Sequence, residues 1–161
     1  MSRPVHRPPR PRQRGVAAIE MAFILPVMMI LLAVPLFFGR VFWHYTVAQK
    51  AAHDAARYLS EIPLTDINNL TRIGYHLAVA GEIVAGEMSD LNPGSDPIAV
   101  FYQCEYRLGY DHCDGKSTPK SVRVGVRITM SDAIFPNFTS DYLGDNGLLL
   151  NAAVAMPYVA N

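Results

Sequence analysis

The sequence lacks the familiar motifs of catalysis. It has no G-x-S-x-G nucleophile turn, no Walker loop, no H-E-x-x-H pair and no glycine fingerprint for phosphate. Its acidic residues are scattered singly along the chain, so no constellation of catalytic groups stands out. These absences argue against an enzyme, and we expect no catalytic residue and no cofactor.

The five histidines and two cysteines are poorly spaced for a metal site. His44 and His53 are nine residues apart on one expected helix, and at 100° per residue they fall on opposite faces. His112 lies beside Cys113 and near Cys104, but the spacing matches no standard zinc pattern. We therefore expect no metal site.

Acidic residues are absent before Glu20, whereas residues 1–14 hold five arginines and four prolines. Such a composition excludes a packed core or a regular helix there. Beyond Arg40 the balance reverses, with eight Lys or Arg against thirteen Asp or Glu. A basic tail before an apolar span and an acidic body after it predict a cytoplasmic N-terminus and an exported body. This topology accounts for the basic tail better than nucleic-acid binding does, so we expect no nucleic-acid partner.

Charge is also absent from the nineteen residues Met21–Gly39, which as a helix would measure about 28 Å. Eleven of them are Ile, Leu, Phe or Val, enough to outweigh the cost of Glu20 at the edge of the run. The run exceeds the apolar core of a cleaved secretory signal, and no A-x-A-like site separates Phe38 from Arg40. We expect one transmembrane helix, with an uncleaved signal anchor as the plain alternative.

The helix is expected to continue past the span, because no Gly or Pro interrupts residues 40–61. Trp43 and Tyr45 follow the apolar run, where they would join either an interfacial aromatic belt or the core. Apolar side chains recur at steps of three and four and predict one packing stripe, formed by Val41, Tyr45, Ala48, Ala51, Ala52, Ala55 and Leu59.

The rest of the chain predicts a second helix and a sheet. The helix is expected from Thr65 or Asp66, as its N-cap, to about Glu87. After a loop the apolar period changes to two, which predicts strands over 98–108, 122–130 and 148–156, the first with Cys104 and Leu108 on its inward face. The fold class is thus α+β, with a long N-terminal helix, a second helix and an antiparallel sheet of about three strands.

The two cysteines both lie on the exported side. In an oxidising compartment they predict a disulfide between Cys104 and Cys113, with zinc as the weaker alternative. Closing this short loop would stabilise the fold by roughly 2–3 kcal/mol in the chain-entropy model.

One stretch of the chain resembles a known signal. Residues 14–26 read RGVAAIEMAFILP, in which Glu20 is the fifth residue after Gly15, small residues lie between them and Leu25-Pro26 follows. This is similar to a type IV pilin-like signal. More narrowly, residues 14–60 closely resemble the TadE-like family of minor pseudopilins, the G-A-A-x-x-E-F-A-x-x-x-P type. Met21 departs from the family, which usually has Phe or Tyr at that position.

The resemblance implies a bacterial inner-membrane precursor that a prepilin peptidase cuts between Gly15 and Val16. Residues 1–15 would be the cytoplasmic leader peptide, 16–39 the transmembrane helix and 40–161 the periplasmic α+β domain. The mature subunit would be a minor pseudopilin of the Flp/Tad type IVb pilus, helping to initiate the fibre or entering it. Implied partners are the peptidase, other pilins and pseudopilins, the Tad inner-membrane assembly platform and membrane lipid. The alternative is an uncleaved, membrane-anchored periplasmic binding domain.

The presence of Glu20 needs an explanation, because a carboxylate buried among apolar helices requires a partner to offset its desolvation. Cleavage would free the amine of Val16, and that amine on a neighbouring subunit is a suitable partner. Glu20 is therefore expected to act in assembly, as a check on register. The alternative is a carboxylate solvated among the lipid headgroups.

Overall fold

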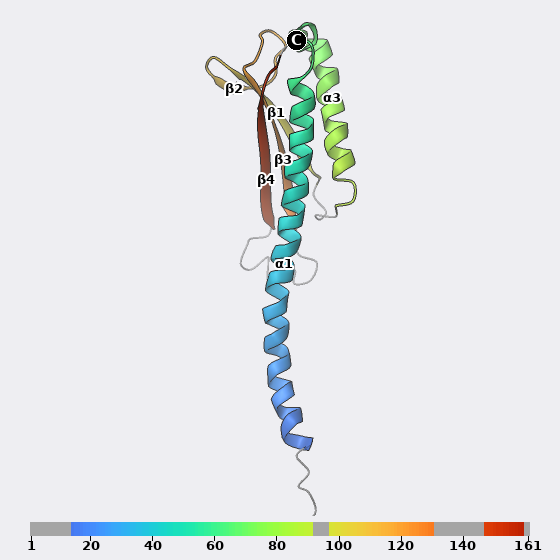
Figure 1. Ribbon diagram of the computed structural model, residues 1–161, viewed down its shortest axis with the longest axis vertical. Coiled ribbons are helices and arrows are strands. Elements are labelled where there is room, and N and C mark those ends of the chain that lie inside the picture. Colours follow the sequence, from blue (N-terminus) through green and yellow to red (C-terminus); the bar gives the residue numbers. More distant parts are fainter. Residues whose placement is uncertain (1–13, 92–96, 131–146, 160–161) are drawn as a thin grey trace, which may run out of the picture. The chain divides into compact units, whose positions relative to one another are not determined.

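The computed structural model describes residues 14–91, 97–130 and 147–159, in two compact units, Met1–Gly39 and Arg40–Asn161 (Figure 1). The second unit begins where the uncharged run of the sequence ends. Its class is α+β, as the sequence predicts. The elements in chain order are α1 (Arg14–Ser60), α2 (Leu64–Ile67), α3 (Leu70–Glu87), β1 (Ala99–Tyr106), β2 (Gly109–Asp111), β3 (Ser121–Met130) and β4 (Leu148–Pro157).

Helix α1 has 47 residues, includes Pro26 and Pro35 and ends three residues before Pro63. Beyond Arg40 it carries the predicted packing stripe, in which small side chains are fully buried. The stripe was predicted wrongly at Tyr45, which is 38% exposed. The residues of this stretch that are no more than 1% exposed are Ala48, Ala51, Ala52, Ala55, Ala56 and Leu59.

The second predicted helix is in fact two helices, which corrects its expected start at Thr65 or Asp66. The α-helical conformation stops after Ile67 and resumes at Leu70. The side chain of Asn69 accepts hydrogen bonds from the backbone N–H groups of Thr71 and Arg72, at 3.1 and 3.2 Å. Asparagine is more favourable as the N-cap of a new helix than in the interior of a helix, and so the helical conformation is interrupted here.

The sheet has four antiparallel strands in the order β2-β1-β3-β4, one more than expected. The additional strand, β2, lies between the first two predicted strands and forms a short hairpin with β1. Strand β1 also ends earlier than predicted, at Tyr106. Leu108 therefore does not face the core but is fully exposed in the connection between the two strands.

The core lies between the helices and one face of the sheet. Cys104 on β1 is buried, as expected. Helix α3 lies beside the part of α1 after Arg40, and Lys50 on α1 forms an ion pair with Glu87 on α3 at 2.5 Å (Figure 1). The inward side chains of β3 are only 0–2% exposed and comprise Val122, Val124, Val126, Ile128 and Met130.

A chain of polar side chains links the three helices. The hydroxyl of Tyr58 on α1 lies 2.7 Å from Nδ1 of His76 on α3, and the Nε2 of His76 lies 3.2 Å from Asp66 on α2. Arg72 donates to the other oxygen of Asp66 at 2.8 Å, and this hydrogen bond, with that of His76, lowers the pKa of the Asp66 carboxyl. Burial raises the pKa of Tyr58. Sequence reasoning missed this network because its members lie on three separate helices.

Candidate membrane anchor and processing segment

The first part of α1 exposes an unbroken series of side chains. Every residue from Ala17 to Leu32 is exposed, and Phe23 and Ile30 are 75% and 68% exposed. Soluble surfaces rarely present so much contiguous apolar area, because water solvates it poorly. By length and composition the helix can cross a membrane. It is therefore consistent with a single-pass membrane anchor.

The predicted cleavage site lies at the start of this helix. Gly15 is in the first turn and is exposed, and a Cβ atom added to it would meet nothing within 4 Å. Residues 1–13 of the expected leader lie outside the described residues, so cleavage between Gly15 and Val16 stays a prediction.

Glu20 lies on the exposed surface of the same helix, four residues after Val16. Residues four apart fall on one side of a helix. Within the described ranges no side chain forms an ion pair or hydrogen bond with Glu20. Its role in assembly remains a prediction.

Aromatic side chains follow the apolar run. Phe42 and Trp43 are 64% and 59% exposed, and Tyr45 is also exposed. The core alternative for Trp43 and Tyr45 is therefore wrong. Their exposure agrees with the aromatic belt that the sequence predicts at a membrane surface.

The histidines of this helix do not come together. His44 is buried, and its Nδ1 lies 2.8 Å from the backbone carbonyl of Arg40, whereas His53 is exposed. The part of the chain that the structure describes contains no cluster of three or more His, Cys, Asp or Glu side chains placed to hold a metal ion.

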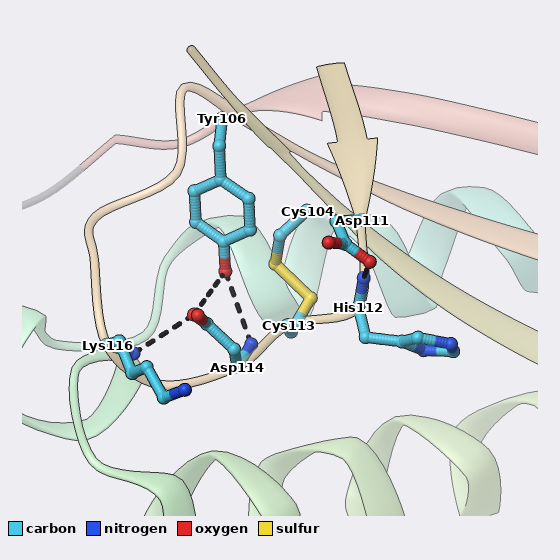
Figure 2. The surroundings of a disulfide bond; sticks show 7 residues. All are labelled: Cys104, Tyr106, Asp111, His112, Cys113, Asp114 and Lys116. Atoms are coloured by element: carbon cyan, nitrogen blue, oxygen red, sulfur yellow. Dashed lines mark hydrogen bonds between the residues drawn. A yellow bond between two sulfur atoms is a disulfide. The ribbon is translucent and has the colours of Figure 1, made fainter. Parts of the chain in front are cut away.

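The cysteines are joined in the disulfide Cys104–Cys113, with their Cα atoms 5.0 Å apart (Figure 2). Beside it the hydroxyl of Tyr106 donates to the carboxylate of Asp114 at 3.1 Å, and the same carboxylate accepts from the backbone N–H of Lys116 at 3.0 Å. The hydrogen bond from Lys116 lowers the pKa of Asp114, and burial raises the pKa of Tyr106. The disulfide and these bonds fix the base of the β1–β2 hairpin.

An exposed apolar helix that can span a membrane, joined in sequence to a disulfide-bonded α+β domain, is consistent with a membrane-anchored protein. The model of the TadE-like protein family matches residues 15–57. The match begins at the predicted cleavage site and includes Glu20 and the apolar run, so the resemblance to TadE-like proteins is confirmed over this segment. Comparisons with curated proteins and with solved structures give no match.

Proposed function

We propose that this chain is a TadE-like minor pseudopilin that takes part in building Flp/Tad type IVb pili. The observation that carries the proposal is the coincidence of two features: the family match over residues 15–57 and the exposed apolar surface of Ala17–Leu32 inside it. A membrane protein related to the Tad pilus accounts for both features. In this proposal the α+β domain has a structural role.

The proposed subunit starts as an inner-membrane precursor with a cytoplasmic N-terminus and a periplasmic domain. A prepilin peptidase removes residues 1–15 and leaves the apolar helix on the mature protein. In this account the helix packs first against lipid and then against other pilins or pseudopilins at the Tad assembly platform. The exchange of one apolar environment for another requires little change in the helix itself, because its surface is apolar on all sides.

Glu20 gives the helical packing its register in this proposal. A carboxylate that moves among apolar helices is costly unless a cation meets it. The amine of Val16, once free, supplies that cation from the adjacent subunit. Since Glu20 lies four residues after Val16, the amine of its own chain is a competing partner, and correct assembly replaces one pairing by the other.

Processing is the step that separates this proposal from its alternative, an uncleaved periplasmic binding domain on a signal anchor. When the chain is coexpressed with the cognate peptidase, we expect intact-mass analysis to show a mature protein that starts at Val16. Gly15→Val should block cleavage, because a β-branched side chain crowds the peptide bond that is cut.

Gly39→Val is the matched control. Gly39 lies in the same helix, is exposed and, like Gly15, has open space where a Cβ would stand. This variant should be cleaved normally. A wild-type protein that keeps Met1 would favour the uncleaved anchor, and a protein that starts near Arg40 would favour a secretory signal.

A further inference from the structure

The tip of the β1–β2 hairpin presents an apolar side chain that the fold does not use. Leu108 is fully exposed, and Arg107 beside it is exposed with no ion pair among the described residues. The turn itself depends on Gly109, whose φ of 121° suits glycine. Turns favour Gly, Asn, Asp, Ser and Pro, so a leucine at this position does nothing for the local conformation.

This tip is held in a fixed position. The disulfide links Cys104 on β1 to Cys113 just after β2, and Tyr106 binds Asp114 across the same loop (Figure 2). A side chain on such a cross-linked hairpin loses little conformational freedom when it binds, which favours its use as a contact.

An open groove of about 720 Å³ lies at the other edge of the sheet, between the end of α1 and the end of β4. Its apolar wall consists of Met156, Pro157 and the 59% exposed Val159. The opposite wall includes Glu61, the first residue after α1, which accepts a hydrogen bond from Arg57 at 3.2 Å through Oε1 only. Both side chains of this pair are more than 60% exposed, so the pair is weak and a second cation can share the carboxylate.

The tip and the groove lie at the same level of the sheet. In the strand register, Tyr110 pairs with Glu105, Glu105 with Ser121, and Ser121 with Pro157. One end of this row is two residues from Leu108, and the other end lines the groove. A second copy displaced along the row therefore brings its tip to the groove of the first, while both copies keep the same orientation, as two chains anchored in one membrane must.

We propose that the hairpin tip of one copy docks in the groove of the next copy. Leu108 packs on Met156 and Val159, and Arg107 binds the free oxygen of Glu61. Because two different surfaces meet, the contact is heterologous: the copy whose tip is docked still has a free groove, and the copy whose groove is filled still has a free tip, so further neighbours can add at both ends. The contact goes beyond the pilus-related function proposed above and requires neither cleavage at Gly15 nor Glu20.

The contact is tested with the full chain reconstituted in lipid vesicles, with a photoreactive benzophenone amino acid in place of Leu108. After irradiation, mass mapping should identify adducts between position 108 and residues 53–61 or 156–159 of another copy. The same amino acid in place of Tyr75, which is 68% exposed on α3, is the control and should give no adduct at these sites. Adducts of position 108 elsewhere on the chain, or none between copies, would overturn the proposal.

Charge and direction sharpen the test. In the chain labelled at position 108, Glu61→Lys should lower the adduct yield at least about threefold, because it repels Arg107. Glu82→Lys, at an exposed acid of α3, should leave the yield unchanged. An equal loss in both variants would refute the role of Glu61.

Two further variants separate the tip from the groove. Leu108→Asp disables the tip and Val159→Asp disables the groove, both at exposed positions that should leave the fold and the disulfide intact. By chemical cross-linking, each variant alone should show no contact through this surface. A mixture of the two variants should form cross-linked dimers but no higher oligomers. A mixture that forms no pairs would contradict a heterologous contact.

Discussion

The two parts of helix α1 differ in the size of their side chains and in what surrounds them. Between Ala17 and Leu32 the helix exposes large apolar residues on all sides. Between Val41 and Leu59 it buries a narrow stripe made mostly of alanine and exposes polar residues beside it. The surface of the first part is favourable in an apolar solvent, and that of the second part allows close packing against the rest of the domain.

This difference shows how one secondary structure serves two environments. Large side chains gain the most when lipid or neighbouring helices surround the backbone, since the transfer energy grows with apolar area. Alanine gains less area but lets the helix lie close to its neighbours and loses no rotamer freedom when buried. Substitutions should therefore affect different properties in the two parts: assembly in the first part and the stability of the fold in the second.

The largest effect is expected at Glu20. Glu20→Ala should leave membrane insertion, cleavage after Gly15 and the folded domain unchanged, and should strongly reduce incorporation into the pilus or its assembly complex. Glu20→Asp, one methylene shorter, should reduce it less. Both variants are tested by measuring piliation in a strain that lacks the native copy. Wild-type piliation with Glu20→Ala would favour the alternative, in which the Glu20 carboxylate is solvated at the membrane boundary.

A large loss of stability is expected in the second part of the helix. Leu59 is 1% exposed, so Leu59→Ala should lower the free energy of unfolding of the domain by about 2–5 kcal/mol. Leu31→Ala, at an exposed position of the first part, should not change it measurably. Denaturant titration in mild detergent, followed by near-ultraviolet circular dichroism, compares the two. Equal losses would show that the two parts of α1 are not independent.

The disulfide should matter to the domain and not to the anchor. Replacing both Cys104 and Cys113 by alanine should lower the free energy of unfolding by about 2–3 kcal/mol, because the unfolded chain is no longer constrained. Fractionation should still find the chain in the membrane. A domain of unchanged stability would mean that the hydrogen bonds of Tyr106 and Asp114 suffice to hold the hairpin.

The smallest effect concerns acid. The pKa of Asp66 is lowered in the folded state, mainly by its hydrogen bonds to Arg72 and His76. Its stabilising contribution is therefore present above the unfolded pKa of about 3.9 and is lost as the pH falls through the lower folded value. Asp66→Asn should reduce the loss of stability between pH 5 and pH 2. Asp90→Asn, at an exposed position, is the control, and equal pH profiles would assign the acid sensitivity elsewhere.

Much of the fold was predictable because its signals are local and periodic. The uncharged run, the alanine stripe and the alternation along β3 each depend on one segment and its solvent. The errors lie where the decisive interaction is specific to a few atoms. Asn69 ends one helix and caps another, and Leu108 leaves the strand because the β1–β2 turn begins before it. Such turns cannot be predicted from the periodicity of apolar residues.

The candidate site was predictable in kind and less so in detail. The spacing between Gly15 and Glu20 is read directly from the sequence, and the family resemblance depends on such spacings. The exposure of Trp43 and Tyr45 required the structure, because an aromatic residue after an apolar run fits both a core and an interface. The groove near Glu61 combines residues about a hundred positions apart, and no pattern in the sequence joins them.

The continuity of α1 across its two parts has a consequence for the order of folding. Starting a helix is slow and unfavourable because several residues must be fixed before the first hydrogen bond rewards them, whereas each added residue then forms one bond. Once the apolar stretch has inserted as a helix, residues after Gly39 extend an existing helix and need no nucleus of their own. We therefore expect the alanine stripe to form early and to provide a surface on which the slower, non-local pairing of the strands takes place.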